Sequence, residues 1–285
     1  MNKTTQKFDL TGCVALVTGG AGLLGEQFCH TLAEAGAAVS IADLNIEAAE
    51  SISERLRQEG CKALALRTDV ADPLSVRQSV ELTLASFGRL DILVNSAALD
   101  PKFDPKHLEA GVEETGKSQH APHHLTFEDY PLELWKTALD INLTGMFLCC
   151  QAVARPMLAQ GSGVIINISS MYGLVGPDQR LYQRQAEQTQ YKPAYYSVTK
   201  AGVLGLTLYL ATYYAGKNIR VNALTPGGVY NGHDETFLQA YAARAVIGRM
   251  AHKDEMNGAL LFLASDASSY MTGANLVVDG GWTAW

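Results

Sequence analysis

Short apolar runs alternate with longer amphipathic segments along most of the chain. The apolar runs are four to six residues long and rich in Val, Ile, Leu and Ala, which is typical of buried strands. They lie at 14–18, 38–42, 63–67, 91–94, 164–169, 219–223 and 275–278. Helical periodicity is found over 23–35, 45–59, 73–87, 131–159, 196–215 and 253–265. This alternation predicts an α/β fold with a seven-stranded parallel sheet and helices on both faces.

The composition indicates one domain that spans residues 1–285. No Ser/Gly-rich or charged run separates two hydrophobic regions, and a hydrophobic share of 47% is enough for a large core. A formal net charge of -7 argues against nucleic acid or an anionic membrane as a partner.

The chain shows no pattern of secretion or metal binding. The segment 1–7 is polar, unlike a signal peptide, and the longest uncharged apolar stretch, 201–216, is shorter than a membrane span. The five cysteines have no C-x-x-C spacing, which suits reduced thiols and a cytoplasmic protein. His120, His123 and His124 have no acidic or cysteine partner at a ligand spacing, so no metal site is predicted.

A glycine-rich loop follows the first predicted strand. Gly20, Gly22 and Gly25 satisfy G-x-G-x-x-G between the strand at 14–18 and the helix at 23–35. In that context the glycines let the backbone approach a pyrophosphate, and the helix N-terminus offers unpaired N–H groups. The alternative is a glycine loop that only turns the chain.

Asp43 ends the second predicted strand, 18 residues after Gly25 and close to the spacing of about 20 expected of a ribose-binding carboxylate. Its charge would repel the additional phosphate of NADP. Residues 19–25 and 44–45 contain no Arg or Lys to offset this repulsion. We therefore predict NAD as the cofactor, with NADP less favoured.

Tyr196 and Lys200 are one helical turn apart, so both lie on the same face of the helix predicted over 196–215. An ammonium beneath a phenol is expected to lower the pKa of the phenol from about 10 toward neutrality. A tyrosine tuned in this way can exchange a proton with a substrate. Alone, Y-x-x-x-K is equally an aromatic residue and a lysine on an amphipathic helix.

With these motifs in this order, the chain resembles the short-chain dehydrogenase/reductase family from about residue 10 to its end. Further matching segments are 69–70, 95–98, 140–145, 165–170, 219–228 and 277–281. The resemblance implies a single-domain Rossmann fold, a doubly wound sheet in the strand order 3-2-1-4-5-6-7. The cofactor is then expected at the carboxyl edge of the strands, at the topological switch point.

The resemblance also implies roles for individual residues. The family's mechanism is a reversible hydride transfer between a secondary alcohol and the nicotinamide. The residues expected to be catalytic are Ser170, Tyr196, Lys200 and Asn142, the last through a water held on its backbone carbonyl. The residues expected to bind the cofactor are Gly19, Gly22, Leu24, Gly25, Asp43, Leu44, Asp69, Val70, Asn95, Ala97, Tyr196, Lys200, Pro226, Gly227 and Val229.

Two departures from the family pattern concern the glycine loop and the substrate pocket. Leu23 occupies the place of the family's second glycine, and Ser170 and Tyr196 are 26 residues apart, about twice the usual distance. The long segments 99–129 and 177–193 are therefore expected to shape the pocket, with 229–245 as a lid.

The polar composition of 177–193 predicts a polar, sugar-like substrate, with Arg180 and Arg184 as a possible clamp for an anionic group. A solvated loop or a subunit contact explains this composition as well. The insertion, the helix over 206–214 and the terminal segment 280–285 also resemble members from surface-sugar and flagellin-modification pathways.

Three functions are consistent with the sequence. The first is an NAD-dependent dehydrogenase or reductase, and the second is a nucleotide-sugar epimerase or dehydratase, which the glycine spacing permits. The third is a non-catalytic NAD-binding regulator. The apolar surfaces of the helices at 131–159 and 196–215 predict a homodimer or homotetramer.

Overall fold

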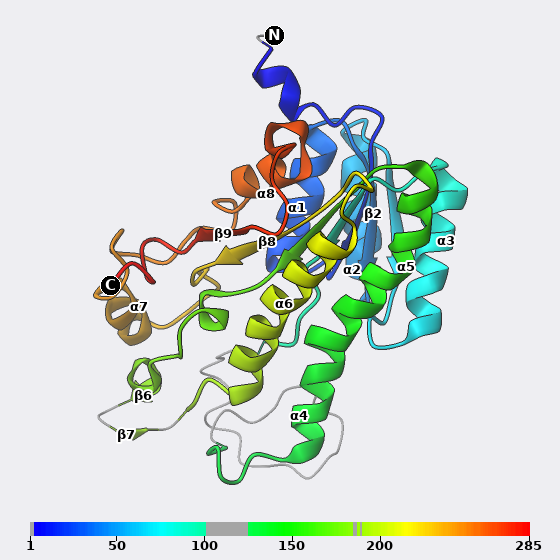
Figure 1. The fold of residues 1–285 in the computed structure, drawn as a ribbon. Coiled ribbons are helices and arrows are strands. Elements are labelled where there is room, and N and C mark those ends of the chain that lie inside the picture. Colours follow the sequence, from blue (N-terminus) through cyan, green and yellow to red (C-terminus); the bar gives the residue numbers. More distant parts are fainter. Residues whose placement is uncertain (1–2, 101–124, 185–186, 189) are drawn as a thin grey trace.

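The computed structural model describes residues 3–100, 125–184, 187–188 and 190–285 (Figure 1). Seven parallel strands form one sheet whose order along the sheet confirms the predicted doubly wound topology. The strands in that order are β3 (Ala63–Arg67), β2 (Ala38–Asp43), β1 (Val14–Thr18), β4 (Ile92–Asn95), β5 (Gly163–Ile168), β8 (Ile219–Pro226) and β9 (Asn275–Val278).

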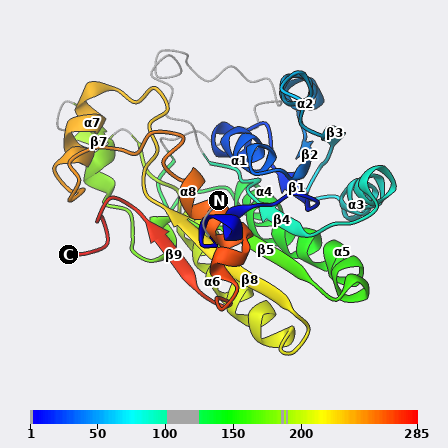
Figure 2. The ribbon, with the colours of Figure 1, turned by 90° about the horizontal axis from the view of Figure 1, so that it is seen from above.

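Helices cover both faces of the sheet (Figure 2). One apolar core joins the sheet to α1 (Leu23–Glu34), α2 (Ile46–Gln58) and α8 (Asn257–Ala264). A second core on the opposite face joins it to α3 (Pro73–Phe87), α5 (Gly145–Gln160) and α6 (Ala194–Tyr213). Because both faces are buried, the central strands read as continuous apolar runs rather than as alternating ones.

The helix predicted over 131–159 is not one regular α-helix. It consists of α4 (Leu132–Leu139), a π-helical turn over Asp140–Thr144, and α5. The whole element, Leu132–Gln160, is long and apolar enough to span a membrane. Its inward residues, among them Cys149, Val153 and Met157, instead belong to the core on the sheet. A core helix of this kind explains its apolar character.

The helix predicted over 253–265 begins later than expected, at Asn257. The Glu255 carboxylate accepts a hydrogen bond from the backbone N–H of His252 at 2.7 Å and forms an ion pair with Arg249. These contacts hold the preceding residues in a turn, which delays the start of α8.

Several short elements lie beyond the carboxyl ends of the strands (Figure 1). A third cluster of buried residues, among them Tyr172, Tyr182, Phe237 and Trp282, packs the predicted insertion against the predicted lid. The short elements here are two 3-10 helices (Met171–Gly173 and Gln179–Tyr182), the hairpin of β6 (Gln183–Arg184) and β7 (Glu187–Gln188), and α7 (Glu235–Ala242). Two more 3-10 helices, Thr5–Phe8 and Asp266–Ser268, lie elsewhere. Most of the predicted 99–129 loop falls outside the described residues.

Candidate active site

The glycine loop between β1 and α1 folds tightly on itself. A Cβ atom on Gly25 would lie 2.0 Å from the carbonyl oxygen of Gly19, and one on Gly19 would lie 2.6 Å from the Cα of Ala97. Gly19 also has a positive φ of 62°, which favours glycine. Gly22 is the N-cap of α1, and no side chain caps this end of the helix. The loop therefore has the close backbone and open helix N-terminus that a pyrophosphate requires.

Asp43 is fixed at the end of β2 next to this loop. Its carboxylate accepts hydrogen bonds from the backbone N–H groups of Ala21 and Asn45, both at 2.9 Å. The neighbouring residue in register on β3 is Arg67, a cation that inspection of the loop sequence alone had missed. The predicted ribose carboxylate thus lies beside the loop, with one basic residue on the adjacent strand.

The other predicted cofactor residues on this side follow the ends of β2 and β3. Leu44 is 48% exposed directly after Asp43, whereas Val70 is buried. The carboxylate of Asp69 accepts the backbone N–H of Ala71 at 2.9 Å, which shapes the turn after β3. Leu24 lies in the first turn of α1, partly buried against the core. These residues lie near the ends of β2 and β3 and the start of α1, where the adenosine of a dinucleotide is expected.

Asn95 is the last residue of β4, the central strand of the sheet, and Ala97 follows it. The Asn95 amide donates hydrogen bonds to Asn167 Oδ1 at 2.9 Å and to Cys150 Sγ at 3.3 Å. Asn95 is only 2% exposed, so its side chain joins β4 to β5 and the helix behind them. Ala97 packs directly against Gly19, as the Cβ geometry above shows.

The segment after β8 closes the opposite side. Pro226 ends the strand, and the N–H of Gly227 donates to Val278 O on β9 at 2.9 Å. A Cβ atom on Gly227 would lie 2.7 Å from the Cα of Asp279, so this position requires glycine. Val229 forms a bridge with Ala251. The backbone expected to lie over the nicotinamide is therefore held on both sides.

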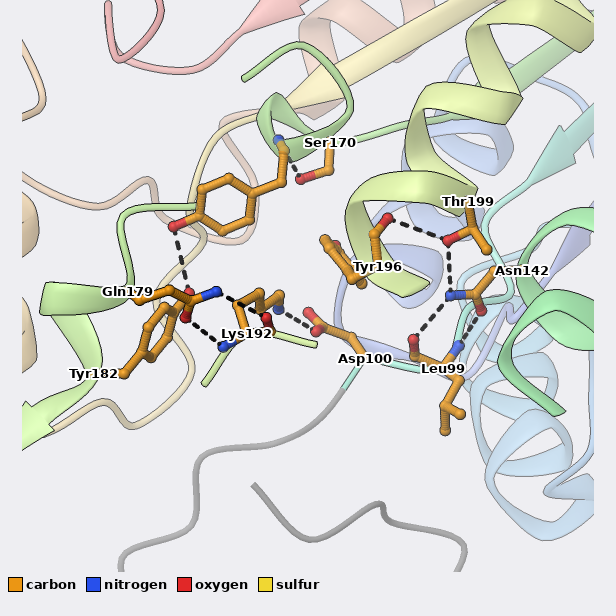
Figure 3. A network of polar contacts seen from close by, with 10 residues as sticks. Leu99, Asp100, Asn142, Ser170, Gln179, Tyr182, Lys192, Tyr196 and Thr199 are labelled. Carbon is orange, nitrogen blue, oxygen red and sulfur yellow. Dashed lines mark hydrogen bonds and ion pairs between the residues drawn. The ribbon is translucent and has the colours of Figure 1, made fainter. Parts of the chain in front are cut away.

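Ser170 and Tyr196 come together between β5 and the first turn of α6 (Figure 3). Ser170 Oγ accepts the N–H of Tyr172 at 3.2 Å, and a hydrogen bond between Ser170 and the Tyr196 phenol lowers the pKa of that phenol. Ser169 instead donates from Oγ to Lys200 O at 2.8 Å. Tyr195 packs against Tyr130 with ring centroids 6.1 Å apart. Ser169 and Tyr195 thus have structural contacts of their own.

Lys200 lies beneath Tyr196, as the helical spacing predicts. Its ammonium is 5.8 Å from the centroid of the Tyr196 ring and donates a hydrogen bond to Ile168 O at 2.9 Å. Because Lys200 is buried, the pKa of its ammonium falls to about 8.

The prediction that Lys200 lowers the pKa of Tyr196 toward neutrality is wrong for the chain without a bound cofactor. Burial of the phenol raises the pKa of Tyr196 well above its ordinary value, although part of the side chain reaches solvent, and the charge of Asp100 raises it further. Desolvation of the phenolate outweighs the hydrogen bond from Ser170. A nearby positive charge would act in the opposite direction and lower the pKa of this phenol.

Asn142 lies in the π-helical turn, behind the catalytic pair. Its Oδ1 accepts the N–H of Leu99 at 2.6 Å, and its Nδ2 donates to Leu99 O at 3.0 Å (Figure 3). In the same turn the N–H of Gly145 bonds to Asp140 O, the i to i+5 pattern that recurs at functional sites. The side chain therefore anchors the start of the 99–129 segment.

Sequence reasoning missed Lys192 and Asp100, which lie on the open side of Tyr196. The Lys192 ammonium is 3.9 Å from the centroid of the Tyr196 ring and forms an ion pair with Asp100. Lys192 is four residues before Tyr196, which is a usable signal in the sequence. However, α6 begins only at Ala194, so helical spacing does not extend to this lysine.

Arg180 does not act as part of the suggested arginine clamp in this structure, because its guanidinium is already paired. The Arg180 guanidinium binds Asp178 at 2.8 Å, and Arg244 forms an ion pair with the same carboxylate. The side chain of Arg184 lies outside the described part of the chain, as do the three histidines considered as metal ligands. Among the described residues no group of three or more His, Cys, Asp or Glu could hold a metal ion.

The fold is a Rossmann-type fold, and the carboxyl edge of its sheet carries a tight glycine loop after β1 and the side chains of Ser170, Tyr196 and Lys200 between β5 and α6. A family model described as enoyl-(acyl carrier protein) reductase matches residues 20–283. The chain belongs to the short-chain dehydrogenase/reductase family.

Individual relatives align over almost the whole chain. The cis-4-hydroxycyclohexanecarboxylate dehydrogenase of Sinomonas cyclohexanicum is 40% identical over 95% of this chain and 96% of its own. The D-threitol dehydrogenase of Mycolicibacterium smegmatis is 36% identical over 97% and 95%. A solved gluconate 5-dehydrogenase from Burkholderia cenocepacia, in complex with NADP and tartrate, is 32% identical over 98% of both chains with a TM-score of 0.82. These relatives support an oxidoreductase that acts on a secondary alcohol of a small molecule.

Proposed function

We propose that the protein is an NAD-dependent oxidoreductase that interconverts a secondary alcohol and a ketone on a small polar molecule. The observation that carries the proposal is the grouping of Ser170, Tyr196 and Lys200 beside the glycine loop. β5 and α6 bring these three residues together at the carboxyl edge of the sheet, where a Rossmann fold binds its dinucleotide.

The cofactor fits the residues at this edge. The loop of Gly19, Gly22 and Gly25 would hold the pyrophosphate, and Asp43 would accept the ribose hydroxyls. When bound, NAD supplies the hydride acceptor of the reaction. Pro226, Gly227 and Val229 would contact the nicotinamide half.

The chain's own residues supply the proton chemistry. Tyr196 would take the proton from the substrate hydroxyl, and Ser170 would hydrogen-bond the same oxygen and orient it. Lys200 would bind the nicotinamide ribose, and Asn142 would hold the water that returns the proton to solvent. Since burial raises the pKa of Tyr196, its ionisation depends on the positive charge of neighbouring lysines and of the oxidised cofactor.

The preference for NAD rests on Asp43, whose charge opposes a 2′-phosphate. Arg67 on the adjacent strand is the residue most able to reduce this repulsion. The hydrogen bonds from the N–H groups of Ala21 and Asn45 keep the Asp43 carboxylate beside the loop, where it would repel a 2′-phosphate.

The polar nature of the substrate is supported by three relatives, which are named for threitol, gluconate and a hydroxycyclohexanecarboxylate, whereas others are named for hydroxysteroids and cyclohexanol. The structure modifies the argument from composition, because the inner side of the insertion is partly aromatic. Tyr182 and Leu181 are buried with Tyr172 and Phe237 next to Tyr196. These four side chains are almost fully buried, so they pack the insertion against the predicted lid, and Tyr196 is a partly exposed aromatic ring at this side of the site.

The protein is further proposed to act in the cytoplasm as a homodimer or homotetramer. Its five described cysteines form no disulfide. Several large apolar side chains on the outer sides of α5 and α6 are exposed, which favours burial in a subunit interface. They are Phe147, Leu158, Leu208, Tyr209 and Tyr213. Light scattering coupled to size-exclusion chromatography would give the mass in solution.

A single assay separates the three candidate functions. Purified protein is incubated with NAD and a panel of secondary alcohols that contains threitol, gluconate and 4-hydroxycyclohexanecarboxylate, and NADH absorbance and substrate conversion are both followed. A dehydrogenase accumulates NADH with its ketone product. Conversion without NADH would indicate an epimerase or dehydratase, and NAD binding without conversion of any alcohol would indicate a regulator.

A further inference from the structure

Lys192 approaches the catalytic tyrosine more closely than Lys200 does. Its ammonium lies 3.9 Å from the centroid of the Tyr196 ring, against 5.8 Å for Lys200. Its side chain is only 7% exposed, so water screens its charge weakly. A cation over the ring favours a phenolate more than a neutral phenol.

The insertion holds Lys192 in this position through its backbone. The Gln179 amide donates from Nε2 to Lys192 O at 3.1 Å, and its Oε1 accepts the N–H of Lys192 at 2.9 Å (Figure 3). Pro193 follows and starts α6, which carries Tyr196. The backbone of Lys192 is therefore fixed from both sides, by the insertion and by the start of α6, while the ion pair with Asp100 holds its ammonium.

Asp100 opposes Lys192 from the other side of the site. It forms an ion pair with the Lys192 ammonium, and half of its carboxylate surface remains exposed. The charge of Asp100 raises the pKa of both Tyr196 and Lys200, whereas that of Lys192 lowers the pKa of Lys200. The pair thus places two opposite charges next to one phenol.

We propose that Lys192 is a positioning residue that stabilises the ionised form of Tyr196, and that Asp100 sets how much of this stabilisation Tyr196 receives. This inference rests on the proposed function, because it concerns the tyrosine that exchanges the proton. The 177–193 insertion then contributes a positive charge next to Tyr196, in addition to its expected role in shaping the substrate pocket.

Other titratable groups surround the same phenol and have to be considered. On α6 these are Tyr195 and Lys200, and on the turn after β5 they are Ser170 and Tyr172. Tyr182 belongs to the insertion, and His233, before α7, is influenced by both Lys192 and Asp100. Lys192 and Asp100 carry opposite charges, so removing one should have the opposite effect on Tyr196 from removing the other.

The test compares the pH dependence of kcat/KM for alcohol oxidation in four proteins: wild type, Lys192→Met, Lys192→Arg and Asp100→Asn. Lys192→Met should move the midpoint of the rise with pH upward by about one to three pH units, as expected for loss of a weakly screened unit charge about 4 Å from the ring centroid. Lys192→Arg retains the charge and should restore the midpoint to near that of the wild type. Asp100→Asn should move the midpoint downward.

The outcomes distinguish this inference from the proposed function. If the wild type forms no NADH with any alcohol, the proposed function fails. If the wild type is active but Lys192→Met lowers kcat/KM equally at every pH, Lys192 has only a structural or substrate-binding role and the inference is overturned. Should Lys192→Met not fold, Asp100→Asn decides alone, since an unmoved or raised midpoint would contradict the role of the pair.

Discussion

The side-chain amide of Asn142 makes two hydrogen bonds with the backbone of Leu99, which lies 43 residues earlier in the chain. One connects the Asn142 carbonyl oxygen to the Leu99 N–H, and the other connects the amide nitrogen to the Leu99 carbonyl. This pairing joins the π-helical turn to the segment that leads to Asp100. Asn142, which is expected to be catalytic, therefore also fixes the backbone next to Asp100, whose charge acts on Tyr196.

Replacing Asn142 by alanine should destabilise the protein and slow turnover together. The backbone groups of Leu99 would lose their partners, which costs about 1–3 kcal/mol in the free energy of unfolding. Denaturant unfolding and steady-state kinetics measure the two effects. Asn218→Ala is the control, because it removes an exposed hydrogen bond to Gly161 O before the amino ends of β5 and β8, and it should cost about 1–2 kcal/mol with unchanged turnover.

Tyr196→Phe should lower kcat by about 10²–10⁴-fold, because the proton of the substrate hydroxyl loses its acceptor. NAD affinity, measured by calorimetry, should change little, since the aromatic ring remains. Tyr195→Phe provides a matched control on the adjacent residue. The Tyr195 hydroxyl is buried and has no hydrogen-bond partner among the described residues, so activity should be retained. A near-normal rate for Tyr196→Phe would rule out its catalytic assignment.

Asp43→Asn should reduce the preference for NAD over NADP by about tenfold or more, equal to about 1.4 kcal/mol. The neutral amide no longer repels a 2′-phosphate. Arg67→Ala should change the preference in the opposite direction, because it removes the basic residue in register with Asp43. The ratio of kcat/KM values for the two cofactors measures both changes, and a ratio that neither variant alters would place the ribose elsewhere.

Gly25→Ala should abolish cofactor binding and destabilise the fold by at least about 2 kcal/mol. The added methyl group would overlap the carbonyl oxygen of Gly19, only 2.0 Å away, and force the loop apart. Gly258→Ala in α8 is the control, since a Cβ atom there meets nothing within 4 Å. Thermal unfolding with and without NAD compares the variants, and an NAD-induced rise in Tm for Gly25→Ala would contradict the proposed cradle.

Lys200→Met should change how stability depends on pH. Burial lowers the pKa of Lys200 from 10.5 to about 8, so between these values the unfolded chain binds the proton and the folded chain does not. Stability from this group therefore rises with pH across the window from about 8 to 10.5, by up to about 3 kcal/mol. The variant lacks this contribution. Its unfolding free energy relative to wild type should consequently fall as pH increases through the window, as urea titrations at several pH values would show.

Much of the fold could be predicted because the local signals agree with one another. Each central strand is a continuous apolar run, and Asp72 with Pro73 marks the start of α3 by capping its first N–H groups. The interruption at Asp140–Thr144 had no such signal, since it contains no Gly or Pro and its two apolar residues, Ile141 and Leu143, are compatible with a continuing helix. Apolar spacing does not distinguish an α turn from a π turn.

The sequence by itself determined the alternation of strands and helices, the glycine-rich turn after the first strand and the pairing of Tyr196 with Lys200, because these depend on short-range spacing and on which faces of an element are apolar. The strand order followed from the resemblance to the family and not from spacing. Only the tertiary structure decided the electrostatics of the phenol. Burial raises the pKa of Tyr196, and Lys192 and Asp100 reach it from segments 92 residues apart in the chain. Desolvation and Coulomb interactions depend on distance in space and on exclusion of water, and neither quantity is encoded in the spacing of residues along the chain.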